Sequence, residues 1–314
     1  MEIEKIYQMF ILGTGNLEKS LAKGLGGVIF FSKDIDSEIN FKSLIKQIKQ
    51  KASIPPFLSI DQEGGRVERT ERIYPRRLSA KYAYEKGEQF LIQQTTQMVN
   101  ELKEFGINLN FAPCADVNTN PNNPIIGERA FSNNPDDVIK GVNIVSKIHR
   151  ESDILPCLKH YPGHGDANAD SHKTLPQITL SLDKMEEFHI KPFRECYADM
   201  IMAAHLHCTC FDKDILPTSL SHNALNYLRN VLNYKGIIIS DDMVMKGIKY
   251  PAGEACIRGI NAGLNMFIYR EANDISIGAI ESVIKHAEQN SEFREKIEES
   301  YSKIINIKKK YKII

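Results

Sequence analysis

The sequence lacks an excess of charge of either sign, since 40 lysine and arginine residues balance 40 aspartate and glutamate residues. Binding to nucleic acid or to an anionic membrane usually requires a basic face, and a balanced chain shows none. Long apolar runs are also missing, because none approaches the ~20 residues of a membrane span. The first 13 residues contain acidic side chains and only a short apolar patch, unlike a secretory signal. We therefore expect a cytoplasmic protein with a small-molecule partner, no nucleic acid and no membrane.

Nucleotide-binding motifs are absent as well, because neither GxGxxG nor GxxxxGK[ST] occurs. The six cysteines are few for 314 residues, and a chain of this size needs no disulfides to stabilise its core. We interpret them as reduced thiols that are mostly buried. No low-complexity linker or shift in composition divides the chain, so we expect one domain over residues 1–314.

Short apolar segments are what the sequence does contain, and they recur eight times with amphipathic stretches between them. Most are nearly continuous apolar runs, which is typical of parallel strands covered on both faces. A strand followed by a helix, eight times over, predicts a single-domain α/β fold of the (β/α)8 TIM-barrel type. The predicted strands are residues 9–12, 27–31, 57–60, 107–111, 154–158, 200–204, 236–239 and 266–269.

The stretches between these runs have helical composition. The first connection, residues 13–26, has room for only a short helix. A lysine-rich amphipathic tail at residues 291–314 predicts a last helix packed on the outside of the barrel. The other main predicted helices are residues 37–51, 87–105, 135–151, 182–199 and 251–263.

Polar clusters gather where the predicted strands end. They are residues 61–69, 113–129, the loop 159–176, His205 with His207, and Asp241 with Asp242. In a barrel of this type the carboxyl ends of all strands converge on one face, where such enzymes keep their active sites. We therefore expect these clusters to form one site.

Asp241 and Asp242 end a run of three isoleucines. A partly desolvated carboxylate at the mouth of a barrel suits a nucleophile, or a group that stabilises developing positive charge. The alternative is a helix cap, which aspartate readily forms. Because side chains alternate along a strand, we expect the two residues to point to opposite faces and to divide these roles.

The loop 159–176 places Asp170 two residues before His172, close enough for the carboxylate to orient the imidazole and favour its charged form. Such a pair suits a general acid, although His172 could also be a solvated loop residue. Lys159, His160, Arg69 and Arg129 could donate hydrogen bonds to a polyhydroxylated ligand or an anion. For either arginine, a surface salt bridge is the alternative.

The main rival interpretation is a metal site. His205, His207, Cys208 and Cys210 form a dense cluster that other residues could join, namely His160, His164, His172 and Asp241. An HxH at a strand end can bind zinc, but the CxC spacing is not the CxxC of common zinc sites.

Four of these stretches together resemble glycoside hydrolase family 3, in particular its bacterial β-N-acetylglucosaminidases (β-hexosaminidases) of peptidoglycan recycling. They are residues 61–69, residues 116–129, the loop KHYPGHGD of residues 159–166 with Asp170-Ser-His172, and residues 236–242. They occur in the family's order, and the loop is the most specific of them. Two positions depart from the pattern, because Asn265 stands where the family usually has aspartate and Cys114 lies in a normally aliphatic stretch.

The resemblance implies a role for each matching residue. Asp241 is then the nucleophile and His172 the acid/base, paired with Asp170, while the sugar-binding positions are Asp61, Arg69, Arg129, Lys159 and His160.

The implied activity is that of a retaining exo-β-N-acetylglucosaminidase. It would remove non-reducing terminal N-acetylglucosamine from β-1,4-linked muropeptide fragments (GlcNAc-anhydroMurNAc-peptide), with no metal, no cofactor and no obligate protein partner. Three alternatives stay open: a metal-dependent barrel hydrolase, a β-glucosidase-type member of the same family, and a non-catalytic sugar-binding protein.

Overall fold

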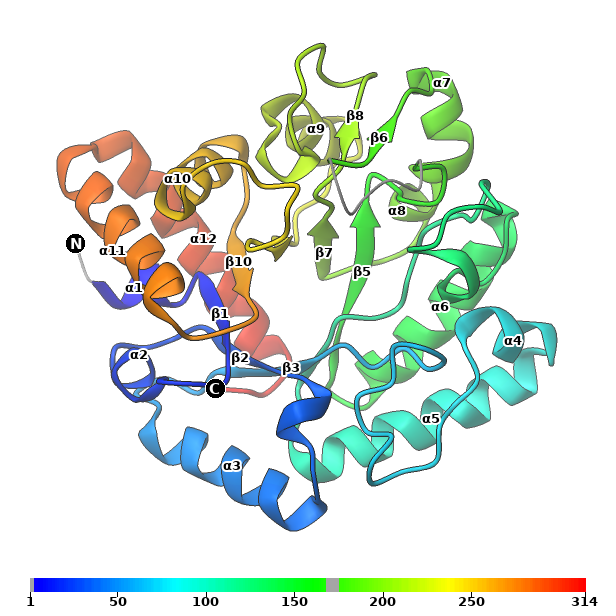
Figure 1. Ribbon diagram of the computed structural model, residues 1–314, viewed down its shortest axis with the longest axis horizontal. Helices are drawn as coiled ribbons and strands as arrows, with labels where there is room; N and C mark the ends of the chain where they lie inside the picture. The colour runs from blue at the N-terminus through cyan, green and yellow to red at the C-terminus, as the bar shows by residue number, and fades with distance from the viewer. Residues whose placement is uncertain (1–2, 168–174) are drawn as a thin grey trace.

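Eight parallel strands close into a barrel in the order β1-β10-β9-β7-β5-β4-β3-β2, with helices outside them (Figure 1). The computed structural model describes residues 3–167 and 175–314. The predicted (β/α)8 fold is confirmed, and each of the eight apolar runs overlaps one strand. The strands are β1 (Phe10–Gly13), β2 (Gly27–Phe30), β3 (Phe57–Ile60), β4 (Leu109–Asn110), β5 (Leu155–Tyr161), β7 (Met200–Ala203), β9 (Ile237–Asp242) and β10 (Met266–Tyr269).

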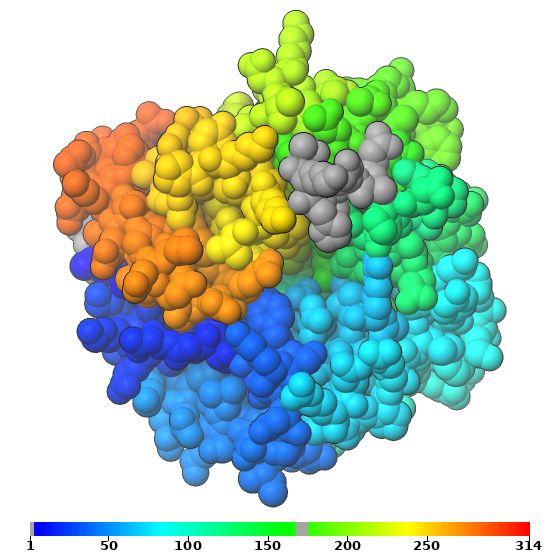
Figure 2. Space-filling view, in the orientation of Figure 1, coloured from blue at the N-terminus to red at the C-terminus, as the bar shows by residue number. Residues whose placement is uncertain are grey.

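The barrel strands are buried throughout, except for the last two residues of β9. Each strand faces the barrel interior on one side and a helix on the other, which explains the nearly continuous apolar runs. Closure pairs Phe10 of β1 with Phe267 of β10. The first and last barrel strands therefore lie side by side, and Figure 2 shows blue N-terminal residues next to orange residues of the last quarter of the chain.

Several helices begin where the side chain of a capping residue accepts from a free N–H group of the first turn. Asn134 accepts from the backbone N of Asp136 ahead of Pro135, as expected from the proline and acids that open this helix. The first connection holds a helix of five residues, α2. The α-helices outside residues 182–199 are α1 (Ile3–Tyr7), α2 (Glu18–Ala22), α3 (Glu38–Lys51), α4 (Ala80–Glu85), α5 (Glu88–Phe105), α6 (Pro135–Glu151), α9 (His222–Asn226), α10 (Ala252–Ala262), α11 (Asp274–Gln289) and α12 (Ser291–Lys310). Within the described ranges, no helix is both long and apolar enough to cross a membrane.

The prediction of one continuous helix over residues 182–199 is wrong. It divides into α7 (Leu182–Lys184), a π-helical turn (Met185–His189) and α8 (Lys191–Glu195). Pro192 has no backbone N–H to donate, so a regular helix cannot run through it. The widened turn before it is closed by the backbone N of Ile190, which donates to the carbonyl of Met185 at 2.7 Å. A second π-helical turn spans Tyr227–Val231, and 3-10 turns span Ser32–Asp34, Gly127–Arg129 and Thr218–Leu220.

A small parallel sheet beyond the barrel strands was not predicted. Its strands β6 (Gln177–Ile178) and β8 (His207–Cys208) have two residues each, too few to give a recognisable pattern. Figure 1 shows the sheet beyond the tips of β5 and β7. A separate apolar cluster that includes Ile178, Met185 and Leu206 packs it onto the barrel. The segment that follows the loop 159–176 is therefore anchored.

Helix α12 buries a lysine at the amino end of the barrel. The Lys308 side chain is fully buried, and its Nζ donates to Gln8 Oε1 and to the carbonyl of Pro55, both at 2.8 Å. Its Nζ also lies 5.0 Å from the centroid of the Phe57 ring. None of these partners carries a charge, and burial lowers the pKa of Lys308 to about 7.

This burial predicts a pH-dependent stability. Between about pH 7 and the ordinary pKa of 10.5, the unfolded chain binds a proton at Lys308 that the folded chain does not. The free energy of unfolding should therefore rise with pH across this window, by up to about 1.4 kcal/mol per pH unit. Urea unfolding at several pH values should show the slope in the wild type and its loss in Lys308→Met. The exposed neighbour supplies the control, because Lys309→Met should keep the slope.

Candidate active site

A pocket of about 650 Å³ opens at the carboxyl ends of the barrel strands. This volume lies in the range of pockets that take small molecules. Six of the eight predicted site residues line it, namely Asp61, Arg69, Arg129, Lys159, His160 and Asp241. The other two, Asp170 and His172, lie outside the described residues.

A chain of alternating charges forms one wall of the pocket. Lys159 Nζ lies 2.7 Å from Asp61 Oδ1 and 2.6 Å from Glu63 Oε1. The guanidinium of Arg129 donates to both oxygens of Glu63 at 2.9 Å. Arg69 extends the chain more loosely, with 4.0 Å between its Nη2 and Asp61 Oδ2.

The buried members of this chain stay charged because each has an opposite charge beside it. Burial alone would raise the pKa of Glu63, but the charges of Arg129 and Lys159 hold it well below its usual range. Burial would lower the pKa of Lys159, yet Asp61 and Glu63 raise it above its ordinary value. The wall therefore presents fixed donors and acceptors.

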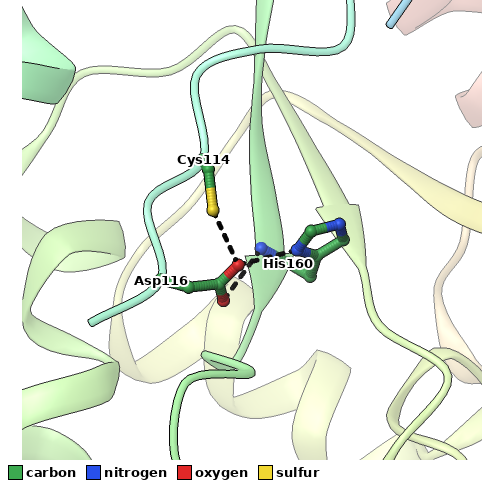
Figure 3. A group of neighbouring side chains, drawn as sticks. All are labelled: Cys114, Asp116 and His160. Carbon is green, nitrogen blue, oxygen red and sulfur yellow. Dashed lines mark hydrogen bonds and ion pairs between the residues drawn. The ribbon is translucent and has the colours of Figure 1, made fainter. Parts of the chain in front are cut away.

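Asp116 holds His160 in place from behind the pocket (Figure 3). Its Oδ2 accepts from His160 Nδ1 at 2.7 Å and from Cys114 Sγ at 3.1 Å. Its Oδ1 accepts from the backbone N of His160 at 3.2 Å and from that of His164 at 2.6 Å. Burial alone would raise the pKa of the Asp116 carboxyl, but His160 and these hydrogen bonds hold it well below its usual range.

Cys114, Asp116 and His160 form the one group, within the part of the chain that the structure describes, whose potential metal ligands all lie within 4.8 Å of one another. Their hydrogen bonds oppose metal binding. The Cys114 thiol donates its proton to Asp116 Oδ2, so both atoms are already used in a hydrogen bond. Arg129 Nη2 donates to His160 Nε2 at 3.3 Å, which leaves the ring proton on Nδ1, where a metal would have to bind. We therefore interpret the group as a hydrogen-bonded support.

A bulge in β5 helps to bring two adjacent residues to the same pocket. Lys159 pairs with Met202 of β7, but Tyr161 pairs with Ala203, so His160 is an extra residue in the strand. Pairing of the β4 segment with β5 resumes beyond β4, where Cys114 bridges to Lys159. That contact places Asp116 beside His160.

Asp241 and Asp242 point to different sides, as strand alternation predicts, although Asp242 caps no described helix. Asp241 lines the pocket, whereas Asp242 pairs with Arg270 and accepts from the backbone N of Val244 at 3.3 Å. Burial would raise the pKa of Asp241, but His160, His205 and the backbone N of Asp242 hold it below its ordinary value. Asp241 is thus an ionised carboxylate in the pocket.

The histidine and cysteine cluster predicted as a rival metal site does not converge within the described ranges. His205 lines the pocket with Asp241, and its Nδ1 lies 2.7 Å from Ser219 Oγ. His207 instead pairs through Nδ1 with the carbonyl of Leu216 at 3.3 Å. Cys208 and Cys210 contact each other, with 3.3 Å between their sulfur atoms. All six cysteines are free thiols, and five of them are buried.

Sequence reasoning assigned no role to Glu63 or Asp116. The position of Glu63 could have been predicted, because side chains alternate beyond β3. Asp61 and Glu63 point to one side, and Gln62 points to the other, toward Glu68 and Thr70. Asp116 gave no such signal, because its partner His160 lies 44 positions away.

Asn265 lies at the other end of the barrel from the pocket. It precedes β10, whereas the pocket opens where the strands end. Its side chain pairs with Arg229 and Ser300. The missing aspartate charge therefore does not alter the pocket.

The barrel and its charged pocket define a TIM-barrel enzyme. Residues 3–307 match the family model described as the glycosyl hydrolase family 3 N terminal domain. The chain is 34% identical over 269 residues to β-hexosaminidase A of Pseudoalteromonas piscicida, covering 77% of this chain and 45% of that protein. It is 33% identical over 255 residues to a β-hexosaminidase of Tolumonas auensis, covering 78% and 75%.

The fold is similar to that of a glycoside hydrolase family 3 β-N-acetylglucosaminidase from Paenibacillus sp. str. FPU-7. The TM-score is 0.92 at 26% identity, over 100% of this chain and 63% of that one. The chain thus spans less than half of the Pseudoalteromonas protein and less than two thirds of the Paenibacillus chain. The chain belongs to glycosyl hydrolase family 3.

The position of Glu63 between two cations predicts a large effect of its neutralisation. Glu63→Gln leaves Lys159 and Arg129 without their shared counter-charge, and breaking a buried ion pair costs about 3 kcal/mol or more. Urea unfolding at neutral pH should show that loss of stability. The control is Glu254→Gln, which removes an exposed pair with Arg258 worth about 0.5 kcal/mol or less. Equal losses in the two variants would contradict the assignment.

Proposed function

We propose that the protein is a retaining exo-β-N-acetylglucosaminidase. Its substrate would be β-1,4-linked muropeptide fragments, from which it removes non-reducing terminal N-acetylglucosamine. The observation that carries this proposal is the ionised Asp241 in a pocket that also contains a fixed chain of charges. The names of the β-hexosaminidase relatives support the choice of sugar. We place this activity in the cytoplasm, with no cofactor and no obligate protein partner.

Asp241 is proposed as the nucleophile. It is held at the end of β9 by the barrel, and its pKa lies below its ordinary value, so it is ionised at neutral pH. Its carboxylate would attack the anomeric carbon and form a covalent glycosyl-aspartate, which water then hydrolyses with overall retention. The N–H of Asp242, which donates to Asp241 Oδ1 at 2.7 Å, leaves the other carboxylate oxygen for the attack.

His172 is proposed as the acid/base and Asp170 as its partner, on the part of the loop outside the described residues. Imidazolium His172 would protonate the departing oxygen, and neutral His172 would then take a proton from the attacking water. Asp170 would stabilise each imidazolium.

The proposed sugar-binding groups are Asp61, Arg69, Arg129, Lys159 and His160. Sugar hydroxyls both donate and accept, so a wall of alternating carboxylates and cations can satisfy each of them. The wall is already assembled and hydrogen-bonded, which lowers the entropy cost of orienting the substrate.

The nucleophile can be tested by trapping. A fluorinated N-acetylglucosaminide with a good leaving group should inactivate the enzyme with one label per chain, and peptide mapping should place the label on Asp241. If the substrate's own acetamide is the nucleophile, no label forms and a thiazoline analogue inhibits strongly instead. That second pattern would overturn the covalent mechanism.

The acid can be tested by the choice of leaving group. His172→Ala should lower kcat/KM for a natural disaccharide about 10²- to 10⁴-fold, since general acid catalysis is typically worth that much. An activated aryl glycoside, whose leaving group needs no proton, should lose far less. His164→Ala is the control, because a change at that pocket histidine should affect both substrates alike. Equal losses for both substrates in His172→Ala would exclude His172 as the acid.

A further inference from the structure

A second pocket, of about 350 Å³, lies at the amino ends of β9 and β10. Arg229, on the π-helical turn before β9, lines it. Its Nη1 donates to the carbonyls of Tyr234 at 3.1 Å and Gly236 at 2.6 Å, and its Nη2 donates to Asn265 Oδ1 at 2.5 Å. All three acceptors are neutral. We call this cavity the Arg229 pocket.

Arg229 has no ion-pair partner among the described residues, unlike two other arginines that are at least as deeply buried. Arg77 pairs with Glu68 and Glu101, and Arg129 pairs with Glu63. Burial lowers the pKa of Arg229, but an arginine side chain remains protonated in proteins. A buried charge with only neutral partners favours the approach of an anion.

The other charges of the Arg229 pocket compensate Arg229 only in part. Glu299 is the one carboxylate that lines the pocket; its charge acts on Arg229 from beyond ion-pair distance, and it pairs with Lys303 at 2.8 Å. Lys235 and Lys296 add two further cations to the lining. Lys303 is paired with Glu299, and Lys296 is paired with Glu292 at 3.2 Å. Arg229 and Lys235 have no ion-pair partner among the described residues, so the pocket carries an excess of positive charge.

We propose that the Arg229 pocket binds a phosphate group, either as the free ion or as the monoester of a small molecule. Phosphate has the tetrahedral oxygens that guanidinium groups recognise and a charge near −2 at neutral pH, which matches the excess of cations. The cavity is also larger than one phosphate ion, so an attached small molecule can be accommodated. Helix α12 and the starts of β9 and β10 meet at this pocket, so the bound anion stabilises the base of the barrel.

A substitution at Asn265 can give Arg229 a negatively charged partner within the protein itself. Its Oδ1 accepts from Arg229 and from the backbone N of Ile238 at 2.9 Å, while its Nδ2 donates to Ser300 Oγ at 3.1 Å. In Asn265→Asp the first oxygen keeps both donors, and the second accepts from the Ser300 hydroxyl. The variant therefore retains the hydrogen bonds of the fold while giving Arg229 a carboxylate partner.

The test is titration with inorganic phosphate and, separately, with glucose 6-phosphate, followed by calorimetry and thermal unfolding at constant ionic strength. In the wild type, the unfolding temperature should rise with phosphate and saturate. Asn265→Asp should unfold at a higher temperature without phosphate and bind it at least ~10-fold more weakly. Tighter binding of glucose 6-phosphate than of phosphate would identify the ligand as a monoester, and equal binding would identify the free ion.

Asn261→Asp is the matched control, because it adds the same charge to the exposed rim of the Arg229 pocket, where Asn261 contacts Lys296 and not Arg229. It should retain most of the phosphate affinity. A wild type that shows no saturable response would overturn the proposal. So would phosphate binding that survives unchanged in Asn265→Asp, since it would then lie elsewhere, for example in the active-site pocket. The measurement uses no glycoside, so its outcome is independent of the proposed enzymatic activity.

Discussion

The ion pairs of the buried Lys159 are the constraint on which the pocket depends. Removing a charge from water is costly unless an opposite charge compensates it, and Asp61 and Glu63 supply that charge where the lysine ends. Glu63 in turn fixes Arg129, and Arg129 contacts His160, which Asp116 holds from behind. Residues that follow β3 and β4 are thereby tied to β5 by charge as well as by strand pairing. The geometry of the wall exists before any ligand arrives, which is the condition for selective binding and for electrostatic catalysis.

Buried cations have different kinds of partner at the two ends of the barrel. At the carboxyl end, the buried cations Lys159 and Arg129 have carboxylate partners, and the wall is rigid and balanced. At the amino end, Lys308 and Arg229 have only carbonyl and amide partners. Neutral acceptors satisfy hydrogen bonds but leave the charge uncompensated. We therefore expect the stability of the amino end to respond to added anions and to protons above neutral pH, whereas the paired carboxylates of the carboxyl end would respond to protons only in acid.

The fold could be predicted from the sequence because a barrel strand buried on both faces is apolar along its whole length, and eight such runs leave few other arrangements. The different orientations of Asp241 and Asp242 followed from alternation along a single strand. The pocket wall was predicted only in part. Asp116 meets His160 across 44 positions and through a bulge, and neither the contact nor the bulge leaves a periodic trace. The sheet of β6 and β8 was missed because two-residue strands are shorter than any recognisable period.

The charges and hydrogen bonds of the described pocket limit which of its groups can act as a general acid. A general acid at neutral pH must hold a proton that it can release, so its pKa must lie near that pH. Glu63 is ionised far below it, and Asp61 is held in an ion pair by Lys159. His164, whose pKa burial lowers to about 4, is neutral, and burial lowers the pKa of His205 as well. His160 has its Nδ1 proton bound to Asp116 and its Nε2 facing Arg129. Each of these carboxylates and histidines is thus committed to another partner or has a pKa unsuited to a general acid. This distribution of charges supports the proposal that the acid for the departing oxygen is the pair of Asp170 and His172 on the loop, with Asp241 of the barrel as the proposed nucleophile.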